Sequence, residues 1–314
     1  MSGVEGGPNY SVEVEGLRVQ FGDFIAVKDI SFNVNAGEIF GFLGANGAGK
    51  TTTIRVLCGL LEPNLGDVRV MGLNPKQGLD AIKSRVGYMS QRFTLYDDLT
   101  VDENLSFAAS LRKLTREKFS RRKKDLLEFI GFERPLNTLV KNLPGGLKQQ
   151  VSLCAATLHD PDIVFLDEPT AGVTPTYRAR FWSLIRSMAA SGKTVFVTTH
   201  YMDEAEQCDR IALMRDGSLI ALDSPGGLKR STFPEPIYEI SSSREKLDEF
   251  WFESIKKRPE ILKIQPHGLR YHAQLSKGVV EGQLRELVSS GCVVRVIPPS
   301  LEDVFIRLVE GGLP

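Results

Sequence analysis

One octapeptide constrains this chain more than any other feature of its sequence. Residues 44–51 read Gly-Ala-Asn-Gly-Ala-Gly-Lys-Thr and match the pattern G-x-x-x-x-G-K-[ST] in full. Glycines at these places let the backbone turn tightly, so that its N–H groups point inward at phosphate oxygens. A compact apolar run, Glu38–Leu43, precedes the loop, and apolar residues at helical spacing follow it as far as Pro63. We therefore predict a strand, a phosphate-binding loop and a helix whose positive N-terminal end faces the phosphates.

Each part of the loop has an expected task. Lys50 is expected to reach the β- and γ-phosphates, and the hydroxyl of Thr51 to bind Mg²⁺. The pattern thus predicts ATP and Mg²⁺ as the cofactors. The residues predicted to bind the nucleotide here are Gly44, Ala45, Asn46, Gly47, Ala48, Gly49, Lys50, Thr51 and Thr52.

Two adjacent carboxylates follow the next strongly apolar segment. Residues Asp162–Leu166 form a continuous apolar run that suits a buried parallel strand. The strand would deliver Asp167 to its end, where a carboxylate binds Mg²⁺, usually through water. Glu168 points in a different direction and is expected to orient or deprotonate the attacking water. Alone, such a pair is more often a solvated turn, but beside a phosphate loop we favour the catalytic interpretation.

Composition limits the partners. The 314 residues carry 39 basic and 39 acidic side chains, a formal net charge of zero. Binding nucleic acid through counterion release needs a basic surface, so we expect no nucleic-acid partner. No stretch approaches the roughly 18 to 20 apolar residues that span a bilayer, so a membrane role is expected to come through a partner. Scattered cysteines and the lack of a signal-peptide pattern at Met1–Leu17 favour the cytosol.

The apolar pattern divides the chain into parts. We expect a flexible tail at 1–10, a nucleotide-binding domain at 11–232 and an accessory domain at 233–314. Within the second part, residues from about 92 to 153 are charged and helix-favouring, and we interpret them as an inserted helical subdomain. The accessory domain has the order strand, helix, strand, strand, helix, strand, which favours a ferredoxin-like arrangement. Its expected elements are Ile237–Ile240, Arg244–Lys257, Ile261–Gln265, Leu269–Leu275, Val279–Ser289 and Cys292–Ile297, before a final helix from Leu301.

A third motif makes a family resemblance specific. Leu143-Pro144-Gly145-Gly146-Leu147 stands at the start of a helical run. The order of phosphate loop, Gln91, this Gly-Gly motif, Asp167-Glu168 and His200 resembles the ATPase domain of ABC transporters over roughly Val12–Leu228. The resemblance implies an α/β fold, with a P-loop, RecA-like core, the inserted helical subdomain and the small α+β C-terminal domain.

The same resemblance implies further site residues. Gln91 would touch Mg²⁺ or the lytic water and sense the transport partner, and His200 would contact the γ-phosphate. Phe21 would stack on adenine, although a core aromatic is the commoner role for such a residue. Gly145 and Gly146 would complete the nucleotide site of a second ATPase subunit, so that two domains enclose two ATP molecules.

The sequence departs from the family pattern at two positions. Pro144 replaces the usual serine, whose hydroxyl hydrogen-bonds the γ-phosphate of the opposing ATP, and proline offers neither hydroxyl nor N–H. Thr174 replaces an aspartate that helps to couple the two sites. We interpret these two departures as weakening or retuning the arrangement in which two domains enclose the ATP molecules. We expect ATP hydrolysis that is slow without partners.

Two segments indicate the kind of transport. Residues 92–105 and 298–305 are similar to the ATPases of drug-export systems of the daunorubicin-resistance kind. This resemblance implies a polytopic transmembrane permease, a second ATPase subunit that is identical or different, and a place on the cytoplasmic face of the membrane. Two alternatives stay open: a soluble ABC ATPase of translation or DNA maintenance, and an importer ATPase, which often carries a C-terminal β-barrel.

Some side chains are assigned to the structure rather than to the site. The basic run Arg112–Lys124 is expected to be a solvated helix face, with attraction to anionic headgroups as the alternative. Trp182 and Trp251 are expected to pack in the interior. The histidines outside the site are predicted to have no specific partners; they are His159, His267 and His272.

Overall fold

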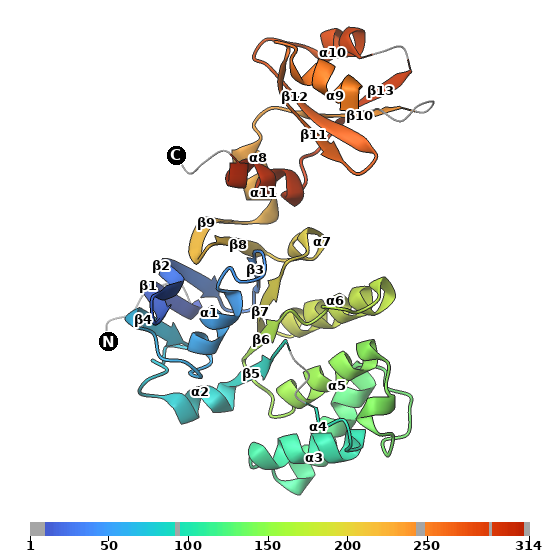
Figure 1. The fold of residues 1–314 in the computed structure, drawn as a ribbon. Coiled ribbons are helices and arrows are strands. Elements are labelled where there is room, and N and C mark those ends of the chain that lie inside the picture. The colour runs from blue at the N-terminus through green and yellow to red at the C-terminus, as the bar shows by residue number, and fades with distance from the viewer. Residues whose placement is uncertain (1–9, 92–94, 243–248, 289–290, 311–314) are drawn as a thin grey trace, which may run out of the picture. The chain divides into compact units, whose positions relative to one another are not determined.

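The computed structural model describes residues 10–91, 95–242, 249–288 and 291–310. The chain separates into two compact units, Met1–Pro225 and Gly226–Pro314, whose elements are labelled in Figure 1. No helix in the described ranges is both long and apolar enough to cross a bilayer. Nearly all of the predicted tail at 1–10, the segment 92–94 and the start of the helix expected from Arg244 lie outside the described residues.

A six-stranded sheet forms the centre of the first unit (Figure 1). Its order is β5-β6-β7-β3-β8-β9, in which β5 to β8 are parallel and β9 is antiparallel to β8. The carboxyl ends of parallel strands share one edge of a sheet, so the residues that follow β3, β6 and β7 meet there. The strands are β3 (Ile39–Leu43), β5 (Val86–Met89), β6 (Ile163–Asp167), β7 (Thr194–Thr199), β8 (Arg210–Arg215) and β9 (Ser218–Asp223).

Burial on both faces explains the apolar runs in this sheet. Every residue of β3, β6 and β7 is buried. Helix α1 packs against β6, and α6 packs against β7. Strands β8 and β9 form a hairpin, with Asp216 and Gly217 both at positive φ. The helices of this core are α1 (Lys50–Leu57), α2 (Leu79–Arg85), α6 (Pro175–Ala190) and α7 (Met202–Ala205).

A cluster of phenylalanines joins the central sheet to a three-stranded antiparallel sheet. The second sheet has the order β2-β1-β4, with β1 (Tyr10–Phe21), β2 (Phe24–Asn35) and β4 (Leu65–Val70). The ring of Phe196 lies at the centre of the cluster. Its centroid is 5.4 Å from those of Phe40 and Phe165, 5.5 Å from that of Phe42 and 6.3 Å from that of Phe32.

We expect Phe196→Ala to lower the free energy of unfolding of this unit by about 3–5 kcal/mol, because it opens a cavity that four other rings cannot fill. Chemical denaturation followed by circular dichroism measures the loss. Phe24→Ala is the control, since that side chain is 64% exposed and its removal should cost about 0.5 kcal/mol or less. Equal losses in the two variants would contradict the central place given to Phe196.

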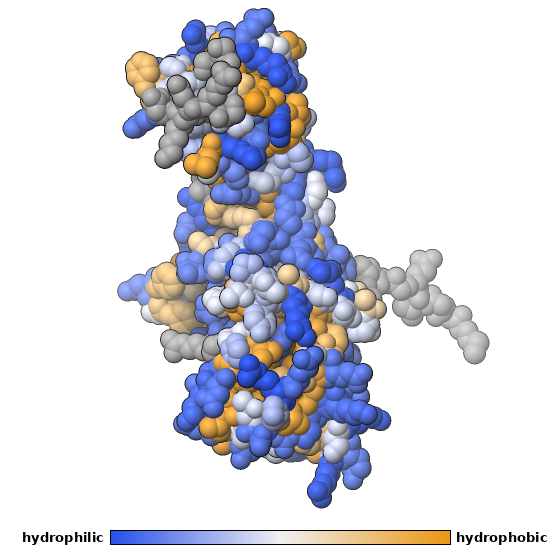
Figure 2. Space-filling view, turned by 90° about the vertical axis from the view of Figure 1, so that its right-hand side faces the viewer, coloured by the Kyte–Doolittle hydropathy of each residue, from blue (hydrophilic) through white to orange (hydrophobic). Residues whose placement is uncertain are grey.

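The expected helical subdomain is present between β5 and β6. Thr100 caps its first helix through a reciprocal capping box with Glu103. Hydrophobic and hydrophilic residues are intermixed over the subdomain on the face shown in Figure 2. The rings of Tyr96 and Phe107 pack edge to face, with centroids 5.2 Å apart. Its helices are α3 (Val101–Leu111), α4 (Arg116–Phe129), the short 3-10 helix Val140–Asn142 and α5 (Gly145–Thr157).

The prediction of a solvated basic face on α4 is wrong for two of its members. Arg122 donates to the carbonyl oxygens of Thr157 and Leu158, at 3.1 and 3.4 Å. Lys123 donates to Asp102 at 2.6 Å. Both cations therefore attach α4 to its neighbours, whereas Arg121 and Lys124 are exposed as expected.

The second unit has the predicted ferredoxin-like order. Its sheet is β11-β12-β10-β13, and every neighbouring pair is antiparallel. The helix expected from Arg244 is described from Glu249, and Trp251 packs on Tyr271 with centroids 5.1 Å apart. The elements are α8 (Pro225–Thr232), β10 (Ile237–Ser242), α9 (Glu249–Lys256), β11 (Ile261–His267), β12 (Arg270–Leu275), α10 (Glu281–Leu287), β13 (Cys292–Ile297) and α11 (Leu301–Glu310).

The three histidines predicted to have no partners do have them. His159 contacts the carbonyl oxygen of Val86 at 3.0 Å. Nδ1 of buried His272 lies 2.8 Å from Oδ1 of buried Asp303, and the His267 ring stacks on His272 with centroids 4.3 Å apart and planes 11° apart. Such parallel rings cannot both hold one ion in their planes, so we interpret this group as a structural contact that positions α11.

Candidate nucleotide site

The predicted phosphate loop connects β3 to α1, as the sequence pattern requires. Two of its glycines are necessary for its path. Gly49 has a φ of 107°, and a Cβ there would lie 2.5 Å from the carbonyl oxygen of Ala26. A Cβ on Gly44 would lie 2.4 Å from the carbonyl oxygen of Met214. A side chain at either position would force the loop away from the sheet.

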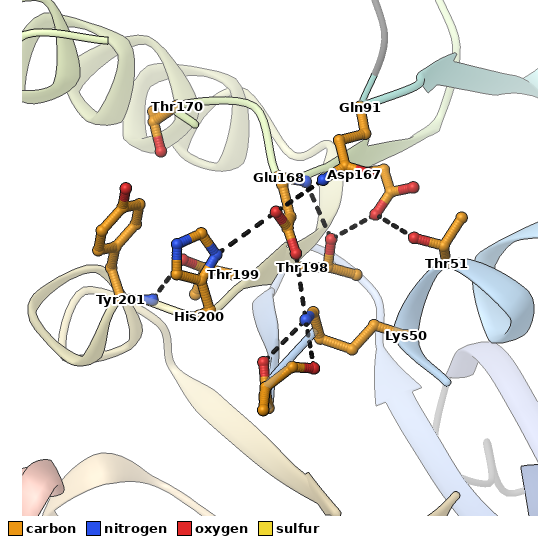
Figure 3. Close-up of polar contacts among 12 residues, drawn as sticks. Lys50, Thr51, Gln91, Asp167, Glu168, Thr170, Thr198, Thr199, His200 and Tyr201 are labelled. Atoms are coloured by element: carbon orange, nitrogen blue, oxygen red, sulfur yellow. Dashed lines mark hydrogen bonds and ion pairs between the residues drawn. The ribbon is translucent and has the colours of Figure 1, made fainter. Parts of the chain in front are cut away.

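Lys50 is held at the centre of the site (Figure 3). Its Nζ donates to the carbonyl oxygens of Gly44 at 2.7 Å and Ala45 at 3.1 Å, and it lies 3.1 Å from Oε1 of Glu168. The Lys50 side chain is 4% exposed. The ammonium group therefore sits beneath the loop with a carboxylate as its counterion.

Asp167 ends β6 as a fully buried carboxylate with one unused oxygen. Its Oδ1 accepts from the hydroxyls of Thr198 at 2.7 Å and Thr51 at 3.1 Å. Burial raises the pKa of Asp167 above its usual value, and the two hydroxyl donors act against that shift. Oδ2 has no hydrogen-bond partner within the described part of the chain. A free carboxylate oxygen beside the Thr51 hydroxyl fits a hard, oxygen-ligated cation such as Mg²⁺.

Glu168 is the meeting point of the remaining polar groups. Its carboxylate lies 3.0 Å from Nε2 of Gln91 and 3.4 Å from Nδ1 of His200, in addition to the contact with Lys50. Its φ of 47° is uncommon outside glycine, and its N–H donates to Oγ1 of Thr198 at 2.9 Å. The structure thus brings together side chains from four separate segments (Figure 3).

An open cavity of about 450 Å³ lies over the loop, and half of the predicted site residues line it, whereas Asp167 and His200 do not. Its volume is in the range of small-ligand sites. The residues that line it are Phe24, Ala26, Asn46, Gly47, Gly49, Lys50, Thr51, Thr52, Gln91 and Glu168.

The aromatic residue at this cavity is Phe24, which the sequence reasoning missed. Phe21 and Phe24 face each other across the β1–β2 hairpin and are 50% and 64% exposed. Phe21 is absent from the described lining, so its stacking on adenine stays a prediction. The signal in the sequence is a second aromatic residue, Phe24, three positions after Phe21.

The Gly-Gly motif lies at the start of α5, away from the lining of this cavity. Pro144 is the residue directly before the helix. Apart from its chain neighbours and the backbone of its own helix, no described atom lies within 4 Å of a Cβ placed on Gly145, so its surface is open. A Cβ on Gly146 would lie 2.3 Å from the ring of Tyr177 on α6. The second glycine is therefore required for packing, which the motif alone did not indicate.

Comparisons with known proteins agree with this geometry. A family model described as "ABC transporter" matches residues 27–171. The chain is 44% identical over 245 residues to the "Probable multidrug ABC transporter ATP-binding protein YbhF" of Escherichia coli (strain K12), covering 75% of this chain but 42% of that relative, less than half of its length. It is 34% identical to the "Nod factor export ATP-binding protein I" of Rhizobium leguminosarum bv. viciae, covering 95% of this chain and 94% of the relative.

Solved structures give the same result. An "ATP binding subunit of ABC transporter" is 29% identical with a TM-score of 0.64, covering 70% of this chain and 92% of that one. The structure of cbiO1 from Clostridium perfringens, described as part of the ABC transporter complex cbiONQ, is 27% identical with a TM-score of 0.65, covering 72% of this chain and 92% of that one.

Proposed function

The chain belongs to the family of ABC transporter ATP-binding proteins, and from that membership we propose that it binds and hydrolyses ATP to energise an exporter through a separate transmembrane partner. The observation that carries the proposal is the convergence of Lys50, Gln91 and His200 on Glu168, beside the free oxygen of Asp167. Export is supported by the relatives, whose names refer to a multidrug transporter and to Nod factor export.

The chemistry follows from the positions of these groups. The loop 44–49 and the start of α1 supply N–H donors for the phosphates. When ATP binds, the ammonium group of Lys50 leaves the carboxylate of Glu168 and contacts phosphate oxygens instead. Mg²⁺, held by Thr51, Asp167 and Gln91, would neutralise charge on the β- and γ-phosphates. Glu168, released from Lys50, accepts a proton from the water that attacks the γ-phosphorus, and the bond to the ADP oxygen breaks. His200, whose Nδ1 lies 3.4 Å from Glu168, would contact the γ-phosphate.

The proposed assembly completes the site. Gly145 and Gly146 of a second ATPase subunit supply the donors that each cavity lacks, and the open surface at Gly145 supports this role. We assign the nucleotide-binding part to residues 11–232 and an accessory part to 233–314. The helical subdomain, with exposed Tyr96, Phe107 and Leu111, contacts the permease at the cytoplasmic face of the membrane.

The alternatives have less support. An importer ATPase often carries a C-terminal β-barrel, whereas the second unit of this chain has an open sheet of four strands accompanied by helices. A soluble ATPase of translation or DNA maintenance would not need a permease. Phosphate release by the purified chain tests the enzymatic part: it should require Mg²⁺ and stop on chelation with EDTA, and release that is insensitive to EDTA would refute the proposed site.

Pro144 offers a test of the two-subunit arrangement. We expect Pro144→Ser to raise kcat/KM for ATP by about tenfold, because the new hydroxyl bonds a charged phosphate of the opposing nucleotide. Pro144→Ala restores the N–H without the hydroxyl and should stay within about twofold of the wild type. The two variants are compared by steady-state phosphate release. Equal values for Ser and Ala would show that the hydroxyl makes no such contact.

A further inference from the structure

Glu204 is a buried charge outside the residues discussed above. It lies on the short helix α7 and is 0% exposed. An ionised carboxylate in such a place is costly unless it is paired and hydrogen-bonded. Its Oε1 accepts from the Thr170 hydroxyl, and its Oε2 accepts from the Thr199 hydroxyl at 2.7 Å. Nε of Arg178 lies 3.3 Å from Oε1 and supplies the counter-charge.

The two threonines belong to the segments that carry the reacting groups. Thr170 stands two residues after Glu168, and Thr199 stands directly before His200 (Figure 3). The Thr199 hydroxyl also accepts the N–H of Tyr201 at 3.0 Å, so it fixes the backbone on both sides of His200. One carboxylate therefore connects the loop after β6 to the last residue of β7.

Arg178 closes the same network from α6. Its guanidinium lies over the ring of Tyr201, 4.1 Å from the centroid, and its Nη1 is 3.6 Å from Asp203. The backbone N–H of Arg178 donates to the carbonyl oxygen of Thr174, the residue before α6, where the loop from Glu168 ends. The side chains of Glu204 and Arg178 therefore contact the loop at Thr170 and the residues on both sides of His200.

We infer that Glu204 is a positioning residue that fixes His200 relative to Glu168, so that the two side chains keep the 3.4 Å separation between Nδ1 and Oε2 seen here. Glu204 does not line the nucleotide cavity. It acts through Thr170 and Thr199, whose hydroxyls donate one bond to each carboxylate oxygen. The inference rests on the proposed function, because it gives Glu204 a part in that same hydrolysis.

Three variants test the inference in the full chain. Glu204→Gln keeps the shape but removes the charge and one acceptor, and Thr170→Val removes one hydroxyl without changing volume. We expect each to lower kcat for ATP about tenfold and to leave KM within about twofold. Thr170→Ser keeps the hydroxyl and should restore kcat. Asp203→Asn is the matched control, because Asp203 is also paired with Arg178 but its side chain is 70% exposed, and it should behave as the wild type.

A second readout does not depend on hydrolysis. The chain has four histidines, so the imidazole protons of His200 are resolvable by NMR. We expect their chemical shifts to move in Glu204→Gln and Thr170→Val and to stay in place in Asp203→Asn. Unchanged His200 shifts would overturn the inference, whatever the ATPase activity. If the wild type hydrolyses ATP and kcat is unchanged in both Glu204→Gln and Thr170→Val, the inference is overturned too. If the wild type does not hydrolyse ATP but the His200 shifts move as expected, only the proposed function is refuted.

Discussion

Replacing Glu168 by Gln is expected to lower the rate of ATP hydrolysis about 100-fold or more, while ATP still binds. The amide has the shape of the carboxylate but cannot take the proton of the attacking water, and general-base catalysis contributes about 10²–10⁴ in rate. Loss of the negative charge also removes a competitor for Lys50, which lies 3.1 Å away. ATP affinity should therefore be equal or higher. Phosphate release and fluorescent-nucleotide titration measure the two quantities.

The control for this substitution is Glu128→Gln, an exposed carboxylate on α4 that should leave both quantities unchanged. A fall in rate that comes with an equal fall in affinity would assign Glu168 to binding instead. Hydrolysis within about threefold of the wild type would exclude it as the base.

The second large effect is expected at Lys50. Lys50→Ala should weaken ATP binding about 10- to 100-fold, because a bond between an ammonium group and phosphate contributes about 1.5–3 kcal/mol. The substitution also leaves the buried Glu168 without its cation, which we expect to destabilise the loop. The double variant Lys50→Ala/Glu168→Gln removes that charge and should show the same loss of affinity as Lys50→Ala.

Titration with a fluorescent ATP analogue gives the dissociation constants. Lys124→Ala removes one exposed positive charge and serves as the control, with an affinity equal to that of the wild type. If the double variant recovers wild-type affinity, the defect of Lys50→Ala belongs to the stranded carboxylate and not to a lost phosphate contact.

The elements that the sequence predicts well are those with strong local patterns. The strands β3, β6 and β7 are continuously apolar because both of their faces are buried. The elements that are not visible in the sequence lack such a pattern. Strand β4 begins Leu-Gly-Asp and is exposed over its first three residues, and α7 has four residues. A short or half-exposed element depends on tertiary packing, which no local window contains.

The same distinction applies to the site. Lys50, Asp167 and Glu168 belong to contiguous motifs, so their chemistry is visible in the sequence. Glu204 is recognised only through its contact with Thr170, 34 residues away along the chain. His272 and Asp303, 31 residues apart, were missed for the same reason. Long-range pairs of polar groups follow from the fold and leave no spacing pattern.

The most direct test of the central claim is Mg²⁺-dependent phosphate release by the complex that a tagged form of this chain brings down from solubilised membranes. We expect a polytopic membrane protein to copurify in a fixed ratio. We also expect the complex to release phosphate faster than the same complex containing Glu168→Gln. A chain that copurifies with no membrane protein, or a complex whose phosphate release equals that of the Glu168→Gln complex, would contradict a transport-coupled ATPase.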